Sequence, residues 1–195
     1  MFSIKPLQLV LALSILSIVI VACSASKENA RAIGKAELYM PLAVGNQWSY
    51  DFDAGDEVLK QHIKVVGKTE QHGTEWFQVE ATFEGTSNTD TSLMRTLGNL
   101  LILYLERQYE EIILIDFGRT EVDSVELSLG YVRQQDQAVE VGMHTFQECV
   151  VVASGHVDAE VGTYARGIGL IESWWFRGKK QITSAHIDGK EFTYE

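Results

Sequence analysis

The stretch Trp76-Phe77-Gln78-Val79-Glu80-Ala81-Thr82-Phe83 decides the fold of this 195-residue chain. Its apolar residues Phe77, Val79, Ala81 and Phe83 alternate with polar residues. This two-residue period is typical of a β-strand with one buried face and one polar face. The stretch therefore predicts a sheet that covers a hydrophobic core on one side.

The same period occurs elsewhere, and turn residues separate the runs. Residues 48–52 alternate in the same way, and residues 71–74 (QHGT) supply turn chemistry before the deciding stretch. Near the end, Asp188-Gly189 separates two strand-like runs, 182–187 and 190–194. An Asp-Gly pair in this setting predicts a tight hairpin, because both central residues of such a turn adopt positive φ.

Residues 97–105 fit two interpretations, a helix with an apolar stripe or a buried strand over 100–105. Gly98-Asn99 is a poor start for a helix, and the following run, 112–117, is rich in β-branched residues that favour strands. Two strands, 100–105 and 112–117, are therefore predicted. No other segment of the sequence combines a helical stripe with capping residues.

Together these runs predict a single all-β domain over residues 37–195. About ten to twelve strands with short turns are expected, arranged as an antiparallel meander. Because strand twist accumulates across a long sheet, we expect a strongly curved sheet or a partly closed barrel.

The N-terminus predicts export and a lipid anchor. Lys5 precedes an apolar run that ends in Ile20-Val21-Ala22-Cys23, the layout of a signal peptide over residues 1–22. These four residues resemble the bacterial lipobox, which implies that Cys23 becomes the first mature residue and carries acyl lipid, palmitate among it, on its sulfur and amine. The run is shorter than the roughly 20 apolar residues of a membrane-spanning helix. A secretory signal cut near Ala22 or Ala25 is the alternative.

Residues 23–36 are small and polar after Cys23 and predict a flexible tether between lipid and domain. Ser24 follows the cysteine, where Asp would indicate inner-membrane retention in enteric-type bacteria. The expected location is therefore the cell outer membrane, facing the periplasm. A host with a single membrane would display the domain on its outer surface.

Charge and cysteine content exclude several classes of protein. The chain has a net charge of −11, and loss of Lys5 with the signal peptide leaves the mature part near −12. Nucleic acid is not an expected partner, because phosphate binding depends on clustered Lys and Arg. With Cys23 committed to lipid, Cys149 has no partner for a disulfide, and its apolar surroundings predict a buried, inert thiol.

Motifs for catalysis, cofactors and metal ions are missing from the sequence. The five histidines lack metal-ligand spacing; His62 and His72 alone would form a weak site, if they faced each other across a hairpin. No serine elbow occurs, so no catalytic residue, cofactor or metal ligand is predicted. An alternative is a hydrolase that uses two carboxylates as its catalytic pair. The acidic residues that could form such a pair include Asp116, Glu121, Asp123 and Glu126.

Aromatic side chains are candidates for lining a concave surface that binds a sugar, lipid or peptide. Neighbours in a strand face opposite sides, so one member each of Trp174/Trp175 and Trp76/Phe77 is expected away from the main core. The candidate aromatic residues are Trp48, Trp76, Trp174, Trp175, Tyr104, Tyr109, Tyr131 and Tyr164.

Several stretches resemble a broad group of uncharacterised bacterial lipoproteins. Residues 39–50 (YMPLAVGNQWSY) are similar to its opening signature of proline-leucine, valine-glycine-asparagine and tryptophan-x-tyrosine, and residues 115–118 (IDFG) to a mid-chain element. Residues 144–149 (HTFQEC) and 164–171 (YARGIGLI) resemble its closing signatures, with His144 in place of a usual glycine and Arg166 in place of a small residue or proline. The resemblance implies a shared β fold and export, and it transfers no catalytic residue.

The sequence thus predicts a membrane-anchored envelope lipoprotein that is not an enzyme and that binds something or organises the envelope. The binding version predicts an apolar cavity inside the curved sheet. Expected partners are the membrane, through the N-terminal lipid, and a hydrophobic ligand or an envelope protein. The alternatives are an envelope hydrolase with a carboxylate pair, or a partner that adds a strand edge to another β protein.

Overall fold

The computed structural model describes residues 35–53, 55, 57–120, 130–153, 161–175 and 178–194, without the side chains of residues 161 and 175. These residues belong to one compact unit, Ile33–Glu195. They form twelve strands and one short helix, α2 (Lys35–Tyr39). The strands are β1 (Gln47–Asp53), β2 (Val58–Gln71), β3 (Thr74–Phe83), β4 (Thr89–Leu97), β5 (Leu100–Leu105), β6 (Glu110–Asp116), β7 (Gly130–Val141), β8 (His144–Ala153), β9 (Val161–Ala165), β10 (Gly169–Trp175), β11 (Gly178–Ile187) and β12 (Lys190–Thr193).

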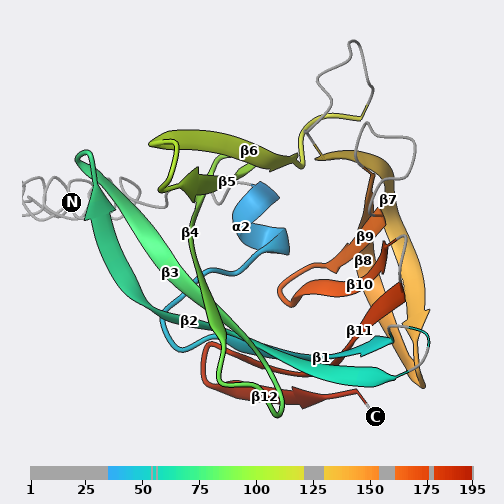
Figure 1. Ribbon diagram of the computed structural model, residues 1–195. Coiled ribbons are helices and arrows are strands. Elements are labelled where there is room, and N and C mark those ends of the chain that lie inside the picture. The colour runs from blue at the N-terminus through green and yellow to red at the C-terminus, as the bar shows by residue number, and fades with distance from the viewer. Residues whose placement is uncertain are drawn as a thin grey trace, which may run out of the picture. The chain divides into compact units, whose positions relative to one another are not determined.

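The sheet closes on itself. Each strand pairs with the next one along the chain, and β1 also pairs with β11, so that β1 to β11 form a barrel (Figure 1). Trp48 lies opposite Ala185 in this closing pair. β12 pairs with the last part of β11 and is an additional strand beyond the ring. The predicted all-β meander is confirmed, and its curved sheet closes into a ring.

One junction of the barrel departs from the antiparallel pattern that the sequence predicted. β6 and β7 run in parallel, and two residue pairs join them, Ile115 with Gly130 and Asp116 with Tyr131. A parallel pair needs a long connection between its strands, here residues 117–129, of which 121–129 lie outside the described part. Alternation along each strand carries no information on the direction in which two strands pair across such a connection.

Positive φ angles at two turns explain the hairpins that the sequence predicted. His72 and Gly73 have φ of 51° and 77°, and Asp188 and Gly189 have φ of 50° and 77°. Turns of this kind match the twist of the flanking strands, and they join β2 to β3 and β11 to β12. Residues 97–117 also follow the prediction, since they form β5 and β6 with Ile102 opposite Ile113 rather than a helix.

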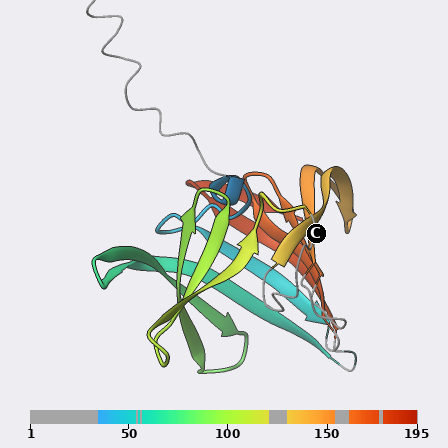
Figure 2. The same cartoon turned by 90° about the horizontal axis from the view of Figure 1, so that it is seen from above.

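Helix α2 lies across one end of the barrel (Figure 2). The amide of Ala36 donates to the carbonyl of Gly98 at 3.1 Å, and the amide of Gly167 donates to the carbonyl of Leu38 at 2.7 Å. The ring of Tyr39 stacks on Phe117 with centroids 5.5 Å apart. The sequence predicted that residues 35 and 36 belong to the tether, but they form the start of α2. Hydrogen bonds join this helix to the turns at Gly98 and Gly167. No helix in the described ranges is both long and apolar enough to span a membrane.

The segment after α2 joins this end of the barrel to the last hairpin. Asn46 is 2% exposed, and its Nδ2 donates to the carbonyl of Pro41 at 2.8 Å. Its Oδ1 accepts a hydrogen bond from the amide of Asp188 at 2.9 Å. A single buried amide side chain therefore fixes both the bend before β1 and the turn after β11.

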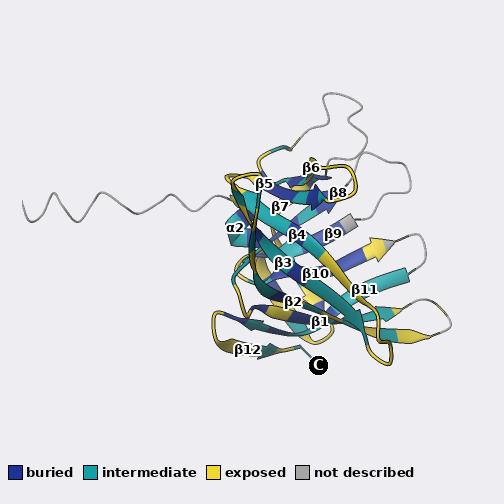
Figure 3. Cartoon of the chain, turned by 60° about the vertical axis from the view of Figure 1, so that its left-hand side comes forward, coloured by how far each residue is buried: buried dark blue, intermediate teal, exposed yellow. Residues whose placement is uncertain are grey.

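Many strands carry buried residues, which are dark blue in Figure 3. Their side chains form clusters on both faces of the sheet. Trp48, Tyr50 and Val79 belong to the largest cluster. Trp76 and Phe77 face opposite ways, as predicted: Phe77 packs against that cluster, while Trp76 lies in a separate one with Leu93, Ile102 and Tyr104. This second cluster is on the outer face, because the register places Leu93 beside Gln78 and Met94 beside Phe77.

Candidate functional site

The interior of the barrel contains a cavity of about 360 Å³. Its size is within the range of about 300–1,000 Å³ that is typical of small-molecule sites. Its lining is mostly apolar and comes from Met40 and from every barrel strand except β3. The lining residues are Met40, Trp48, Tyr50, Ile63, Met94, Leu101, Leu114, Ile115, Gly130, Val152, Gly162, Tyr164, Leu170 and Lys180.

Two aromatic residues of β1 carry polar atoms into the cavity wall. Trp48 and Tyr50 are 2% and 3% exposed, because the alternation of β1 turns both side chains inward. The indole Nε1 of Trp48 donates to the carbonyl of Ile168 at 2.6 Å, and the Tyr50 hydroxyl donates to the carbonyl of Leu170 at 3.1 Å. Burial raises the pKa of Tyr50 far above its usual range. These hydrogen bonds pair the polar atoms of both rings, so the rings present apolar surface to the cavity.

Lys180 is the one charged residue among the described side chains that line the cavity. It lies two residues before the buried Ile182 on β11, and therefore on the same face of the strand. Its Nζ lies 5.0 Å from the ring centroid of Tyr50 and 3.5 Å from Oε1 of Gln61. Lys180 is not among the residues predicted from the sequence to form a site, although its spacing from Ile182 places both residues on one face of a strand.

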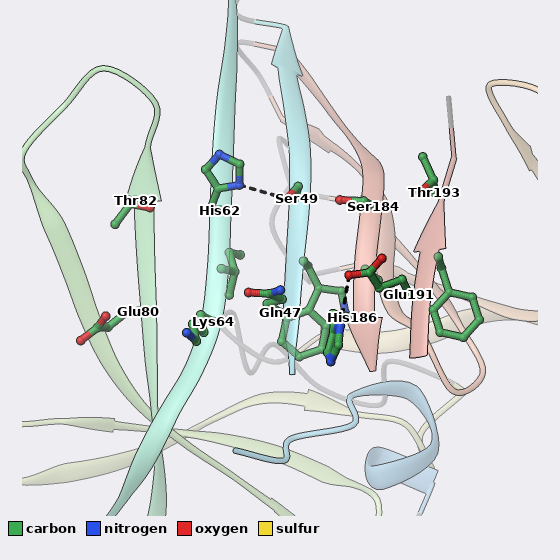
Figure 4. A pocket seen from close by; sticks show the side chains of 14 residues that line it. Gln47, Ser49, His62, Lys64, Glu80, Thr82, Ser184, His186, Glu191 and Thr193 are labelled. Atoms are coloured by element: carbon green, nitrogen blue, oxygen red, sulfur yellow. Dashed lines mark hydrogen bonds and ion pairs between the residues drawn. The ribbon is translucent and has the colours of Figure 1, made fainter. Parts of the chain in front are cut away.

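A second hollow, of about 490 Å³, lies on the outer face of the barrel over β1, β2, β3, β11 and β12. Figure 4 shows that its labelled side chains are polar, with Ser49 and His62 joined by a hydrogen bond and His186 close to Glu191. Oγ of Ser49 and Nδ1 of His62 are 2.9 Å apart. In the described part of the chain His62 makes no ion pair with a carboxylate.

His62 and His72 do not face each other across a hairpin, which was the condition for a weak metal site. The register pairs His62 with Thr82 near the open end of the β2–β3 hairpin, whereas His72 lies at its tip. The ring of His72 instead has Nε2 at 3.1 Å from the Tyr104 hydroxyl. Within the ranges that the structure covers, no group of three His, Cys, Asp or Glu side chains is placed to hold a metal ion.

Cys149 lies in the core, as expected for an inert thiol. It is 0% exposed, and its Sγ donates to the carbonyl of Gln147 at 3.7 Å. Burial raises the pKa of the Cys149 thiol to about 11. The neutral thiol is therefore the form present near pH 7, and it is a poor nucleophile.

The carboxylates proposed for a hydrolase fall into two groups. Glu121, Asp123 and Glu126 lie outside the described residues, while Oδ1 of Asp116 accepts a hydrogen bond from the amide of Gly118 at 2.8 Å, as in a turn. Among the carboxylates that the structure does describe, Glu172 alone is buried, and its Oε1 is 2.8 Å from Nζ of Lys179. Glu172 is therefore held by an ion pair, and no second buried carboxylate accompanies it among the described residues.

The predicted aromatic candidates are distributed over both faces. Trp48 and Tyr164 line the cavity, whereas Trp76 and Tyr104 pack together on the outer face with ring centroids 5.4 Å apart. Trp174 and Tyr109 are 52% and 77% exposed, and Tyr131 is half-buried. The side chain of Trp175 and the lipid-attachment residue Cys23 lie outside what the structure describes.

Comparisons with known proteins add little to this description. No protein-family model matches the chain, and no curated protein matches it. A solved structure that matches is the crystal structure of a "putative lipoprotein" from Parabacteroides distasonis ATCC 8503, at 8% identity and a TM-score of 0.45. The match covers 80% of this chain and 98% of the other.

Proposed function

We propose that this protein is a membrane-anchored envelope lipoprotein that binds a small apolar molecule inside its barrel and does not act as an enzyme. The observation that carries the proposal is the cavity of about 360 Å³ with its mostly apolar lining. Large aliphatic and aromatic side chains around this space favour apolar ligands, because binding removes apolar surface from water.

The anchor in this proposal is lipid on Cys23. Residues 1–23 have the pattern of a lipoprotein signal with its cysteine, and the described part of the domain begins at Lys35. Two or more acyl chains on one residue give stable membrane attachment, whereas a single chain binds only marginally. The domain would then take up its ligand close to a bilayer.

The test is photolabelling of the full chain in native membranes with a diazirine derivative of dodecanol. Peptides from β1 and β11 should carry the label if the alcohol enters the cavity. Leu114→Trp should reduce this labelling about tenfold, because the larger side chain occupies cavity space that the probe needs.

Ile113→Trp is the matched control. Ile113 precedes the lining residue Leu114 in β6 and is 40% exposed, so the same bulk is added outside the cavity. Its labelling should equal that of the unmodified chain. Equal labelling of both variants, or labelling confined to outer-face peptides, would contradict a ligand site inside the barrel.

A further inference from the structure

Polar side chains on the outer face of the barrel form two rows that cross five neighbouring strands, β3, β2, β1, β11 and β12 (Figure 4). The register of the strands places the members of each row beside one another. The first row is Thr82, His62, Ser49, Ser184 and Thr193. The second row is Glu80, Lys64, Gln47, His186 and Glu191.

Both rows line the outer hollow of about 490 Å³. A further hollow of about 330 Å³ shares four residues of the first row and reaches Lys60, so the two hollows form one polar groove. Strands lie about 4.8 Å apart, which makes a row over five strands about 19 Å long. The two rows are two residues apart along each strand, which separates them by about 7 Å. The groove is therefore long and narrow, and it crosses the strands.

Many side chains in the groove are available to a ligand. Ser49 bonds to His62 at 2.9 Å, and Nδ1 of His186 is 3.9 Å from Oε1 of Glu191. In the part of the chain that the structure describes, the hydroxyls of Thr82, Ser184 and Thr193 have no hydrogen-bond partner, although Thr82 and Ser184 are half-buried. Their hydrogen-bonding capacity is left for water or for a bound molecule.

The chemistry of the rows favours an uncharged ligand that is rich in hydroxyl groups. The first row offers hydroxyl and imidazole groups, which both donate and accept hydrogen bonds. The second row combines the carboxylates of Glu80 and Glu191 with the ammonium of Lys64, so it presents both signs of charge. An anionic ligand would meet these carboxylates and a chain with a net charge of −11.

The position of the groove also disfavours an extended peptide. Peptides that add to a sheet bind through the backbone of a free strand edge. The groove lies instead over the face of strands that are already paired, since β1 has β2 on one side and β11 on the other. Only side chains are presented here, and each can bond to one group of a ligand.

We propose that this polar groove is a second binding site, which takes a neutral oligosaccharide laid across the strands. The first row bonds to sugar hydroxyls along the length of the oligosaccharide, and Gln47 bonds to it from the second row. The site is on the opposite face of the sheet from the interior cavity, so it does not depend on the proposed apolar ligand.

The experiment measures binding to the full chain in detergent by saturation-transfer difference NMR. The probes are cellotetraose, maltotetraose and chitotetraose, with tetragalacturonic acid as an anionic counterpart. We expect saturable binding of at least one neutral probe and no binding of the acid. Thr82→Val removes a hydroxyl and keeps the shape of the side chain, so it should raise the Kd of the bound probe about threefold to tenfold.

Thr145→Val is the matched control. Thr145 is a half-buried threonine in β8 that lines neither hollow of the groove, so the same change should leave the Kd unaltered. His62→Phe keeps a ring and removes its nitrogen atoms, and it should raise the Kd about tenfold. If His62→Phe does not accumulate, Ser184→Ala takes its place, with an expected increase of about threefold.

Four outcomes would overturn the proposal. The first is that no neutral probe binds, and the second is that Thr82→Val and Thr145→Val have equal Kd values. The third is that tetragalacturonic acid binds as tightly as the neutral probes. The fourth is self-association in analytical ultracentrifugation that Thr82→Val abolishes, which would make a second copy of the chain the occupant. Photolabelling of the interior cavity is a separate measurement, so the proposed function and this proposal can fail independently.

Discussion

The indole Nε1 of Trp48 donates a hydrogen bond to the backbone carbonyl of Ile168 at 2.6 Å, although the two residues are 120 positions apart. The neighbouring Tyr50 hydroxyl reaches the carbonyl of Leu170 in the same way. Between these two carbonyls lies Gly169, whose φ is +108°. The tryptophan-x-tyrosine stretch of β1 therefore contacts the glycine-x-glycine stretch before β10. The two stretches are far apart in the sequence but hydrogen-bonded inside the barrel.

Loss of the indole donor should destabilise the domain. Trp48→Phe leaves the buried carbonyl of Ile168 without its partner, which costs about 1–3 kcal/mol, and the smaller ring adds a packing loss. Urea unfolding followed by circular dichroism measures the change. Trp174→Phe is the control, because Trp174 is 52% exposed and its replacement should stay within about 0.5 kcal/mol. Equal losses in both variants would contradict the assigned role of Trp48.

The glycine beside the indole should tolerate a methyl group less well than its neighbour. An added Cβ at Gly169 would lie 3.2 Å from Nε1 of Trp48, whereas one at Gly167, with φ of +76°, would meet nothing within 4 Å. Both changes to alanine incur backbone strain, since both φ angles are positive; the strain is about 1–2 kcal/mol near the left-handed helical region, where Gly167 lies. Gly169→Ala should therefore lower the free energy of unfolding more than Gly167→Ala does. A larger loss at Gly167 would show that the contact with Trp48 is unimportant.

The buried thiol should make stability depend on alkaline pH. Burial raises the pKa of Cys149 from 9.0 to about 11, so the unfolded chain releases this proton at lower pH than the folded chain. The resulting stabilisation is fully present below pH 9 and is lost as the pH rises towards 11. Urea midpoints measured from pH 8 to 11 should fall for the unmodified chain.

Cys149→Ala should remove this component of the pH dependence. Tyr194, whose pKa burial raises to about 12, contributes a decline above pH 10 in both proteins. The difference between the two curves therefore isolates the thiol. Parallel curves for the two proteins would contradict the raised pKa of Cys149.

Replacement of the cysteine in the lipobox-like sequence should release the protein from membranes. Cys23→Ala removes the sulfur that would carry lipid, so the domain should move from the membrane fraction to the soluble fraction. Mass spectrometry of the mature N-terminus should show acyl groups on the unmodified protein. An unacylated N-terminus, or a variant that stays in the membrane fraction, would contradict the proposed anchor.

Local patterns in the sequence account for most of the strands. Some features depend on neighbouring residues only, and the structure contains all of them. They are the alternation over 48–52 and 76–83 and the positive-φ turns at His72-Gly73 and Asp188-Gly189. The pairing of β1 with β11 is not local, and neither is the parallel pairing of β6 with β7. Helix α2 has five residues, too few for a periodic signal, and tertiary contacts hold it.

The cavity was harder to predict than the strands because it exists only once the ring has closed. The sequence named Trp48 and Tyr164 among its aromatic candidates, and both line the space. It also named Trp76, which is buried on the opposite face against Leu93 and Tyr104. Alternation separates the two faces of a strand, but it does not show which buried face encloses a hollow.

Closure through β11 also sets an order of events during synthesis. β1 is the first strand to be synthesised, and it pairs with β2 and β11. β11 is complete only when residue 187 has been added. Until then the nascent polypeptide exposes unpaired backbone groups on β1 and β10, which invite aggregation. A chaperone that covers these groups until β11 is complete would protect the chain from aggregation.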